Sequence, residues 1–294
     1  MDRITPVHRY ADLGDVRLHY VETGSGPLVV LLHGFPEFWY SWRYQIPALV
    51  QAGFHVVAPD MRGYNRSAKP PGVRSYRMDL LTRDVERLIR HVGASKAVVV
   101  GHDWGAAVAW GFAMQYPALL ERLVILNVPH PARMLRALRT VRQVRKSWYM
   151  FFFQVPRLPE ALLRANHLAA LRRPFRRDPV QRGAFSEADI ERYVEAARQP
   201  GALTGAINYY RALFRQGFGR ARASIRRIEA PVLVIWGEQD RYLGAELAEP
   251  DRALVPYARV ERLPDASHWV QADQPETVNA LLLDFLADLR PISG

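Results

Sequence analysis

The feature that most constrains this chain is the stretch Val98-Val99-Val100-Gly101-His102-Asp103-Trp104-Gly105-Ala106. The three valines predict a buried strand, and the two glycines allow a tight turn that leads directly into a helix. In such a strand–turn–helix unit, with the pattern Gly-x-nucleophile-x-Gly, the side chain at the apex projects beyond the end of the sheet. The residue at the apex is Asp103, which the pattern therefore predicts to be an exposed nucleophile.

A carboxylate nucleophile limits the chemistry that the chain can perform. It attacks an electrophilic carbon and leaves an alkyl ester, which water must then hydrolyse at the ester carbonyl. This two-step chemistry suits epoxides and alkyl halides, whereas a serine at the same position would suit carboxylic esters. The aspartate therefore argues against a serine-type esterase.

Apolar runs recur along the chain and end at turn or polar residues. They occupy residues 28–32, 55–58, 97–100 and 123–126, and a fifth run, 231–235, follows after a gap of about a hundred residues. Amphipathic helical patterns separate most of them, which predicts a mostly parallel sheet covered by helices on both faces. An earlier run, 16–21, alternates in polarity and predicts an antiparallel strand at the edge of the sheet.

The gap between the fourth and fifth runs differs in composition from the rest of the chain. Residues 131–224 are rich in arginine, aromatic residues and proline and contain no long β-branched run. We interpret them as a helical cap inserted into an α/β core formed by residues 1–130 and 225–294. A leucine-rich helical pattern at 276–289, after Pro275, predicts the last helix of the core.

Candidate catalytic partners for Asp103 follow it in the chain, first an acid and then a histidine. Asp240 ends the fifth apolar run, and active-site residues of open α/β sheets gather at the carboxyl ends of strands. His268 follows another short strand pattern, so we expect it to act as general base, with Asp240 fixing its tautomer. Glu238 and Asp265 are alternatives to Asp240.

An oxyanion hole is also predicted. The segment His33-Gly34-Phe35-Pro36 ends the first apolar run, and its turn can direct the backbone N–H of Phe35 at the site. The backbone N–H of Trp104, at the start of the helix, supplies a second donor. We expect His33, His102 and His130 to have structural roles.

Composition excludes several classes of function. The chain has no cysteine, which removes disulfides, thiolate nucleophiles and cysteine metal sites. No apolar run approaches the roughly 20 residues that span a bilayer, and the first residues lack a signal-peptide pattern, so we expect a cytoplasmic protein. We expect no metal and no organic cofactor.

The net charge of +11 comes almost entirely from arginine. Basic surfaces bind nucleic acids, but no nucleic-acid motif accompanies this charge. Five arginines recur at every third residue of the cap, and we interpret them as a solvated helix face rather than a site for an anionic partner or a membrane surface; they are Arg133, Arg136, Arg139, Arg142 and Arg145.

The chain resembles the α/β-hydrolase-fold epoxide hydrolases over nearly its full length. The matching segments are His33-Gly34-Phe35-Pro36-Glu37, Asp60-Met61-Arg62-Gly63-Tyr64, Gly101-His102-Asp103-Trp104-Gly105 and Ser267-His268-Trp269. The resemblance implies this fold, with a cap between the sixth and seventh strands. It also implies that an epoxide is opened by water to a vicinal diol through an ester on Asp103.

The resemblance further implies two cap tyrosines that hold and protonate the epoxide oxygen. The family pattern Y-x-x-x-F-Q-x-P identifies Tyr149 as the first, and Asn208-Tyr209-Tyr210-Arg211 identifies Tyr210 as the second, with Tyr209 as the neighbouring alternative. An apolar pocket for alkyl or aryl epoxides is expected, lined by Phe35, Trp104, Tyr149, Phe152 and Tyr210. Ser267 and Asn65 depart from the family, which often has glycine at both positions.

Two other functions remain open. Haloalkane and haloacid dehalogenases share the aspartate nucleophile, but Phe35 offers no side-chain donor to a halide, which leaves Trp148 for that role, and Trp104 replaces the arginine that fluoroacetate dehalogenases carry after the nucleophile. A non-catalytic ligand-binding protein of the same fold is the other alternative. The sequence is compatible with a monomer or a homodimer.

Overall fold

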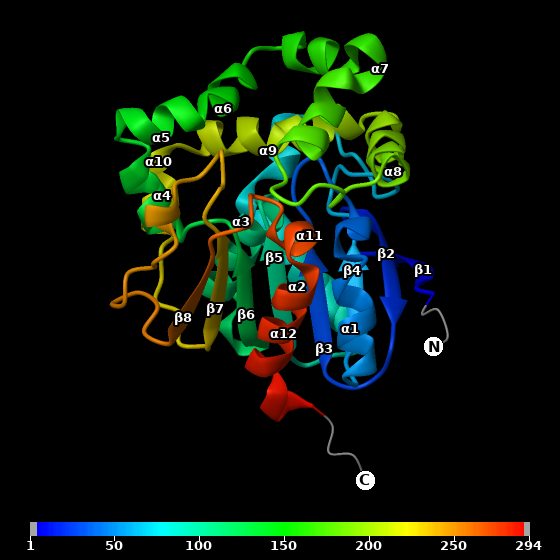
Figure 1. Ribbon diagram of the computed structural model, residues 1–294, viewed down its shortest axis with the longest axis vertical. Coiled ribbons are helices and arrows are strands. Elements are labelled where there is room, and N and C mark those ends of the chain that lie inside the picture. The colour runs from blue at the N-terminus through cyan, green and yellow to red at the C-terminus, as the bar shows by residue number, and fades with distance from the viewer. Residues whose placement is uncertain (1–4, 291–294) are drawn as a thin grey trace.

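The apolar runs form the centre of an eight-stranded sheet in the computed structural model, which describes residues 5–290. The order across the sheet is β1-β2-β4-β3-β5-β6-β7-β8 (Figure 1). The strands from β4 to β8 along this order are parallel, whereas β2 is antiparallel to both β1 and β4. The strands are β1 (Val7–Asp12), β2 (Arg17–Thr23), β3 (Leu28–Leu32), β4 (His55–Pro59), β5 (Ala97–His102), β6 (Leu120–Leu126), β7 (Val232–Gly237) and β8 (Ala258–Leu263).

The mostly parallel sheet is confirmed, but the prediction for its edge was wrong. The alternating run 16–21 forms β2, which is antiparallel as expected and lies inside the sheet rather than at its edge. The edge strand is β1, which the sequence did not reveal. All its side chains except Ala11 are exposed, so its sequence carries no alternation of buried and exposed residues.

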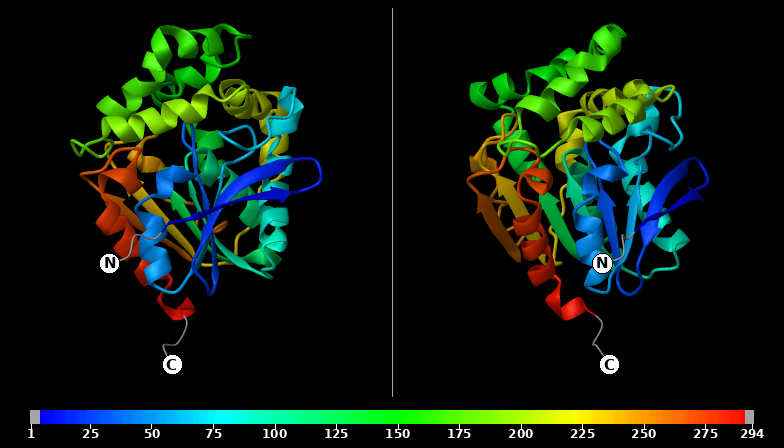
Figure 2. Two further views of the ribbon diagram at one scale, coloured as in Figure 1. Left: turned by 90° about the vertical axis from the view of Figure 1, so that its right-hand side faces the viewer. Right: turned by 45° about the vertical axis from the view of Figure 1, so that its right-hand side comes forward.

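Helices cover both faces of the sheet (Figure 2). Alternate residues of β3 face opposite sides, so that Val29 and Leu31 contact one helical layer while Val30 and Leu32 contact the other. The first layer contains α1 (Gln45–Gln51), α11 (Val270–Asp273) and α12 (Pro275–Phe285), and the second contains α2 (Met78–His91) and α3 (Trp104–Gln115). The helix expected at 276–289 is α12, followed by a short 3₁₀ turn at Ala287–Leu289.

Seven helices lie between β6 and β7 in the chain and cross the carboxyl ends of the parallel strands (Figure 1). We call them the cap helices. They are α4 (Pro131–Ala137), α5 (Val141–Lys146), α6 (Trp148–Phe152), α7 (Leu158–Arg177), α8 (Glu187–Arg198), α9 (Ala202–Gln216) and α10 (Phe218–Ala223). Within residues 5–290, no helix combines the length and the apolar character needed to cross a membrane.

The turn between β5 and α3 requires very close packing of the backbone. Asp103 has φ 49° and ψ −122°, a conformation that non-glycine residues rarely adopt. A Cβ atom on Gly105 would lie 2.0 Å from the carbonyl oxygen of Leu32 at the end of β3. A Cβ atom on Gly101 would lie 2.5 Å from the carbonyl oxygen of Gly105, so both glycines are required by space rather than by φ.

Gly105→Ala is therefore expected to lower the free energy of unfolding by about 2–4 kcal/mol, because α3 must move away from β3. Gly219→Ala in α10 is the matched control, since its new Cβ would meet no atom within 4 Å. The control should change the stability by less than about 1 kcal/mol, in the stabilising direction. Urea denaturation of the two variants measures both values, and equal stabilities would contradict this packing argument.

Candidate active site

Asp103 stands between β5 and α3 with its carboxylate held from two sides. The backbone N–H of Phe35 donates a hydrogen bond to Oδ1 at 2.7 Å, and Nε2 of His268 lies 3.5 Å from Oδ2. Burial alone raises the pKa of Asp103, but the hydrogen bond and positive charge of His268 outweigh it and lower that pKa below its ordinary value. The side chain is 15% exposed, so an ionised and partly accessible carboxylate faces the space above the sheet.

His268 lies in the loop after β8 and contacts the predicted acid. Its Nδ1 is 2.7 Å from Oδ2 of Asp240, which also accepts a hydrogen bond from Nδ2 of Asn127 at 2.9 Å. The other oxygen, Oδ1, accepts hydrogen bonds from the backbone N–H groups of Tyr242 and Leu243 at 2.7 and 2.9 Å. Because the carboxylate only accepts, Nδ1 carries a proton and Nε2 is the ring nitrogen that faces Asp103.

The two carboxylates next to His268 also set the charge of its imidazole. Burial alone lowers the pKa of His268, but the negative charges of Asp240 and Asp103 raise it to about 10. His268 is therefore a buried imidazolium between two carboxylates in the free protein. The alternatives Glu238 and Asp265 are exposed, and Glu238 bonds to Arg262, so Asp240 is the acid that contacts His268.

Asn127 is a member of this network that the sequence analysis missed. It follows β6 with φ 50°, and its Oδ1 accepts a hydrogen bond from the backbone N–H of Gly237 at 2.9 Å. Its side chain therefore joins the ends of the neighbouring strands β6 and β7 while it holds Asp240. The available signal was a polar residue that tolerates positive φ directly after a buried strand.

The cap helices also hold the loop that carries Asp240. Nζ of Lys146, in α5, donates to the carbonyl oxygen of Asp240 at 2.9 Å, and Nε2 of Gln143 donates to that of Tyr242 at 2.8 Å. The hydroxyl of Tyr242 donates to Asp178, just after α7, at 2.5 Å. The ring of Tyr242 lies 5.2 Å from that of His268, so the cap helices and the candidate site share this loop.

Two of the other histidines stabilise the loops around Asp103. In His33, Nδ1 donates to the carbonyl oxygen of Gly34 at 2.9 Å and Nε2 accepts from the backbone N–H of Met61 at 2.9 Å. In His102, one nitrogen lies 2.8 Å from a carboxylate oxygen of Glu37 and the other 2.8 Å from the carbonyl oxygen of His268. Nε2 of Gln271 also lies 3.2 Å from Nδ1 of His102, so this ring joins the loop after β3 to the loop that carries His268.

His130 has a structural position, as expected. Its Nδ1 accepts a hydrogen bond from the backbone N–H of Ala132 at 3.3 Å and so caps the start of α4. Burial lowers its pKa to about 4, which keeps the ring neutral. Its neighbours Val128, Pro129 and Pro131 line the cavity described below.

The two departures from the family pattern have local explanations. Asn65 has φ 39°, and its Nδ2 donates to Asp60 at 2.8 Å, so an asparagine tolerates the turn and adds a bond. The hydroxyl of Ser267 donates to Asp273 at 2.5 Å and accepts from the backbone N–H of Trp269 at 3.1 Å. Each side chain therefore stabilises its loop through hydrogen bonds that a glycine could not form.

Tyr149 and Tyr210 approach Asp103 from two cap helices, α6 and α9. Their rings are 5.8 Å apart, and the ring of Tyr210 lies 4.9 Å from that of Trp104. Burial and the nearby charge of Asp103 raise the pKa of each tyrosine well above its ordinary value, so both hydroxyls keep their protons. Tyr209 faces another way, because its hydroxyl donates to the carbonyl oxygen of Arg62 at 2.7 Å.

These side chains meet at a cavity of about 180 Å³ between the sheet and the cap helices. Asp103, Trp104, Tyr149 and Tyr210 line it on one side. The rest is mostly apolar and comes from α2, α3, α4 and α9, with Met78, Met114, Met134, Leu135, Leu138 and Leu213. The few polar side chains besides those of the site are Gln216 and Ser224.

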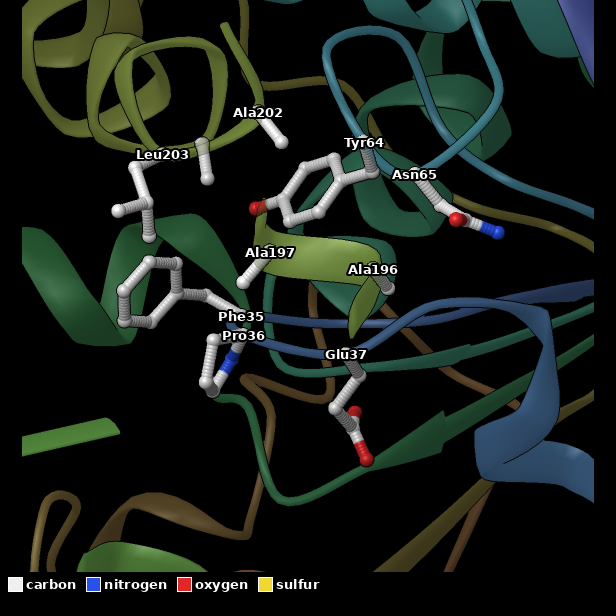
Figure 3. A pocket seen from close by; sticks show the side chains of 10 residues that line it. Phe35, Pro36, Glu37, Tyr64, Asn65, Ala196, Ala197, Ala202 and Leu203 are labelled. Atoms are coloured by element: carbon white, nitrogen blue, oxygen red, sulfur yellow. The ribbon is translucent and has the colours of Figure 1, made fainter. Parts of the chain in front are cut away.

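Two residues expected in the pocket do not line this cavity. Phe152 packs its ring against Trp148 and Phe153, at 6.0 and 6.1 Å, although Tyr149 and Met150 of the same helix face the cavity. Phe35 reaches the site through its backbone N–H, and its ring lies 5.7 Å from that of Tyr210. Its side chain lines a separate pocket of about 10 Å³ with Pro36 and Tyr64, which is too small for a substrate (Figure 3).

Trp104 is the first residue of α3 and directly follows Asp103. Its backbone N–H, which we expected to be the second oxyanion donor, forms no hydrogen bond with Asp103 within residues 5–290. In the same range, no group of three or more histidine, aspartate or glutamate residues is arranged to hold a metal ion.

Comparison with known proteins places this geometry in a family. The family model for the alpha/beta hydrolase fold matches residues 27–275. The AB hydrolase superfamily protein YfhM of Bacillus subtilis is 42% identical over 285 residues, which cover 95% of this chain and 97% of that protein. Epoxide hydrolase 4 of Mus musculus is 39% identical over 291 residues, which cover 96% of this chain and 80% of that protein.

The solved structures agree with the sequence comparison. The crystal structure of an epoxide hydrolase from Bacillus megaterium in complex with an inhibitor superposes with a TM-score of 0.86 at 33% identity, over 95% of this chain and 100% of that one. Epoxide hydrolase A from Mycobacterium thermoresistibile superposes with a TM-score of 0.83 at 34% identity, over 96% and 98% of the two chains. The chain therefore belongs to the α/β-hydrolase fold family and, within it, to the epoxide hydrolases.

Proposed function

We propose that this chain hydrolyses epoxides to vicinal diols through a covalent ester on Asp103, with no metal or organic cofactor. The observation that carries the proposal is the joint position of a nucleophile, a base and two proton donors. The ionised carboxylate of Asp103 and two protonated tyrosines line one cavity, and the imidazole of His268, oriented by Asp240, lies 3.5 Å from that carboxylate. The relatives named as epoxide hydrolases support the same reaction.

In the first step, Oδ2 of Asp103 attacks one epoxide carbon, because Oδ1 is already engaged by the backbone N–H of Phe35. The bond between that carbon and the epoxide oxygen breaks. The oxygen takes a proton from Tyr149 or Tyr210, whose hydroxyls are protonated at neutral pH. Oδ1 becomes the carbonyl oxygen of the hydroxyalkyl ester and remains on the Phe35 amide.

In the second step, His268 acts as a base because the ester has no negative charge. The loss of the Asp103 charge lowers the pKa of His268, so the imidazolium gives its proton to the tyrosinate left by the first step, and the free Nε2 then accepts a proton from water. The hydroxide attacks Cγ of Asp103, and the backbone N–H groups of Phe35 and Trp104 stabilise the oxyanion on Oδ1. The ester bond then breaks, and the proton of the attacking hydroxide passes to the departing diol oxygen, while the other water proton stays on His268 and restores the imidazolium and the Asp103 carboxylate.

The cavity favours an epoxide with one apolar substituent. Its volume of about 180 Å³ slightly exceeds the roughly 150 Å³ of an apolar cavity that binds benzene, so it accommodates an aryl ring or a short alkyl chain. Methionine and leucine side chains offer no polar partner on the side of α2, α3 and α4. We therefore propose aryl and alkyl epoxides, with water as the second substrate.

Within residues 5–290, the cavity has no second tryptophan to donate to a halide, as a dehalogenase would need. Trp148, the side chain left for that role, is 64% exposed and does not line the cavity. The ring of Phe35 carries no donor, and the residue after the nucleophile is Trp104 rather than an arginine.

The ester is the intermediate that tests the proposal directly. His268→Gln should form the ester and fail to hydrolyse it, because no base activates the water. The intact mass of this variant, after incubation with an aryl epoxide, should rise by the mass of the epoxide, with the adduct on the peptide that contains Asp103. The double variant that also carries Asp103→Asn is the control and should show no adduct. An adduct on another residue, or diol formation without Asp103, would sink the proposal.

The adjacent tyrosines provide a matched pair. Tyr210→Phe should lower kcat by about 10²-fold or more, since it removes a proton donor to the epoxide oxygen. Tyr209→Phe should leave kcat within about twofold and lower the stability by about 1 kcal/mol, since it removes only the hydrogen bond to Arg62. Steady-state kinetics and thermal denaturation separate the two effects. The reverse pattern would identify Tyr209 as the donor.

The effect of the Asp103 charge on the pKa of His268 can be measured without substrate. Asp103→Asn removes a negative charge 3.5 Å from Nε2, so the pKa of His268 should fall by about 1 to 3 pH units from its raised value. NMR titration of the imidazole nitrogens measures it, with the exposed Asp265→Asn as control. If the two variants titrate alike, Asp103 does not control the charge of His268.

A further inference from the structure

The positive charge of the chain is concentrated in part of the cap helices. Residues 131–177 contain twelve arginine and lysine residues and one acidic residue, Glu160, so that their net charge of +11 equals that of the whole chain. Glu160 does not offset its basic neighbours, because it is buried and bonds to Arg211 of α9 at 2.5 and 3.0 Å. The rest of the chain is neutral in sum, so this segment gives the molecule a strongly positive end.

Exposed apolar side chains gather in the same segment. Of the ten large apolar side chains that are exposed within residues 5–290, six fall between residues 141 and 162. Val141 and Trp148 are the most exposed, at 69% and 64%. The others are Phe151, Val155, Leu158 and Leu162. Scattered apolar residues are normal on a protein surface, but this concentration indicates a binding surface.

Four exposed arginines alternate with these apolar residues along the chain and form no ion pair within the described part of the molecule. They are Arg139, Arg145, Arg157 and Arg164. Other arginines nearby do have acidic partners, since Arg136 pairs with Asp251 and Arg142 with Glu246, both at 3.5 Å. We call these four arginines and the six apolar residues the outer cap patch.

The elements that carry the outer cap patch form the outermost layer of the molecule. In Figure 1, α6 and α7 lie at the top and α5 lies at the upper left, while α9 lies below α6 and α7. Both ends of the described chain lie toward the opposite side, below the cap helices (Figures 1 and 2). These helices therefore lie at one end of the molecule, away from both ends of the described chain.

We infer that the outer cap patch binds the surface of bilayers that contain anionic lipids. Unpaired arginines attract anionic headgroups, while tryptophan, phenylalanine and leucine side chains enter the boundary between headgroups and acyl chains. Binding of this kind needs no helix that crosses the membrane. It also assigns a partner to Arg139 and Arg145, which belong to the arginine row that the sequence analysis interpreted as a solvated face.

Two other occupants fit the outer cap patch less well. A second copy related by twofold symmetry would bring two copies of the outer cap patch together, and the patch contains no acidic residue to offset its arginines, so the two patches repel. A nucleic acid would attract the arginines but would leave the aliphatic side chains of Val141, Val155, Leu158 and Leu162 without an apolar partner. Charge and apolar exposure together therefore favour a lipid surface.

A role in supplying substrate follows if the proposed function holds. The cavity is also lined from this side of the molecule. Met134 of α4, Leu138 just after it, and Tyr149 and Met150 of α6 are among its lining residues. Apolar epoxides partition into bilayers, so docking by the outer cap patch brings the cavity close to their reservoir. Binding to the bilayer itself does not depend on epoxide chemistry.

Co-sedimentation with large unilamellar vesicles tests the inference without substrate. The full chain should bind vesicles that contain phosphatidylserine in phosphatidylcholine, bind vesicles of phosphatidylcholine alone far more weakly, and lose affinity as salt is raised. Two variants remove the two halves of the patch. One carries Arg139→Gln, Arg145→Gln, Arg157→Gln and Arg164→Gln, and the other carries Trp148→Ser, Leu158→Ser and Leu162→Ser.

Each variant should lose at least about tenfold in vesicle affinity. The control removes the same number of charges from exposed arginines outside the cap helices, with Arg9→Gln, Arg17→Gln, Arg74→Gln and Arg227→Gln. It should bind vesicles nearly as the parent does. All variants should hydrolyse a water-soluble epoxide at the parental rate, so failure of the proposed function is visible separately.

Equal binding of the parent and either patch variant overturns the inference, as does failure of the parent to bind anionic vesicles. Analytical ultracentrifugation and a DNA-binding assay cover the other occupants. A dimer that the patch variants dissociate, or tighter binding to DNA than to anionic vesicles, would likewise overturn it.

Discussion

The close approach of α3 to the end of β3 is the constraint on which the candidate site depends. Gly105 lies against the carbonyl oxygen of Leu32 with no room for a side chain, and this contact forces Asp103 into its strained turn. The same contact brings the loop after β3 beside the nucleophile, so that the backbone N–H of Phe35 reaches Oδ1. One packing requirement thus positions the attacking carboxylate and a donor for its developing charge, while the rigid sheet bears the strain.

The second half of the site is built by neighbouring strands. His268 follows β8, Asp240 follows β7 and Asn127 follows β6, and these three strands are adjacent in the sheet. Their carboxyl ends therefore bring together side chains that are far apart in the sequence. The buried carboxylate of Asp240 accepts three hydrogen bonds, from Asn127 and from the backbone N–H groups of Tyr242 and Leu243, and its fourth contact is the imidazole.

The central strands and the positions of Asp103, Asp240 and His268 could be predicted from the sequence because each depends on a local pattern with a physical cause. Buried parallel strands need apolar runs, the tight turn needs its glycines, and strand ends determine where the acid and the histidine lie. By contrast, β1 is held by backbone hydrogen bonds at an exposed edge and shows no apolar alternation. The lining of the cavity depends on the packing of several helices, which no local pattern encodes; for this reason Phe152 was placed in the pocket although its ring packs elsewhere.

The bonds from α5 and α7 to the loop at Asp240 limit how the molecule can move. An outward rotation of these helices would pull Lys146 and Gln143 away from the loop and break the bond between Tyr242 and Asp178. The acid would then lose the support that aligns the imidazole. The helices α5 and α7 are therefore not a free lid, because their position and the alignment of the acid depend on the same hydrogen bonds.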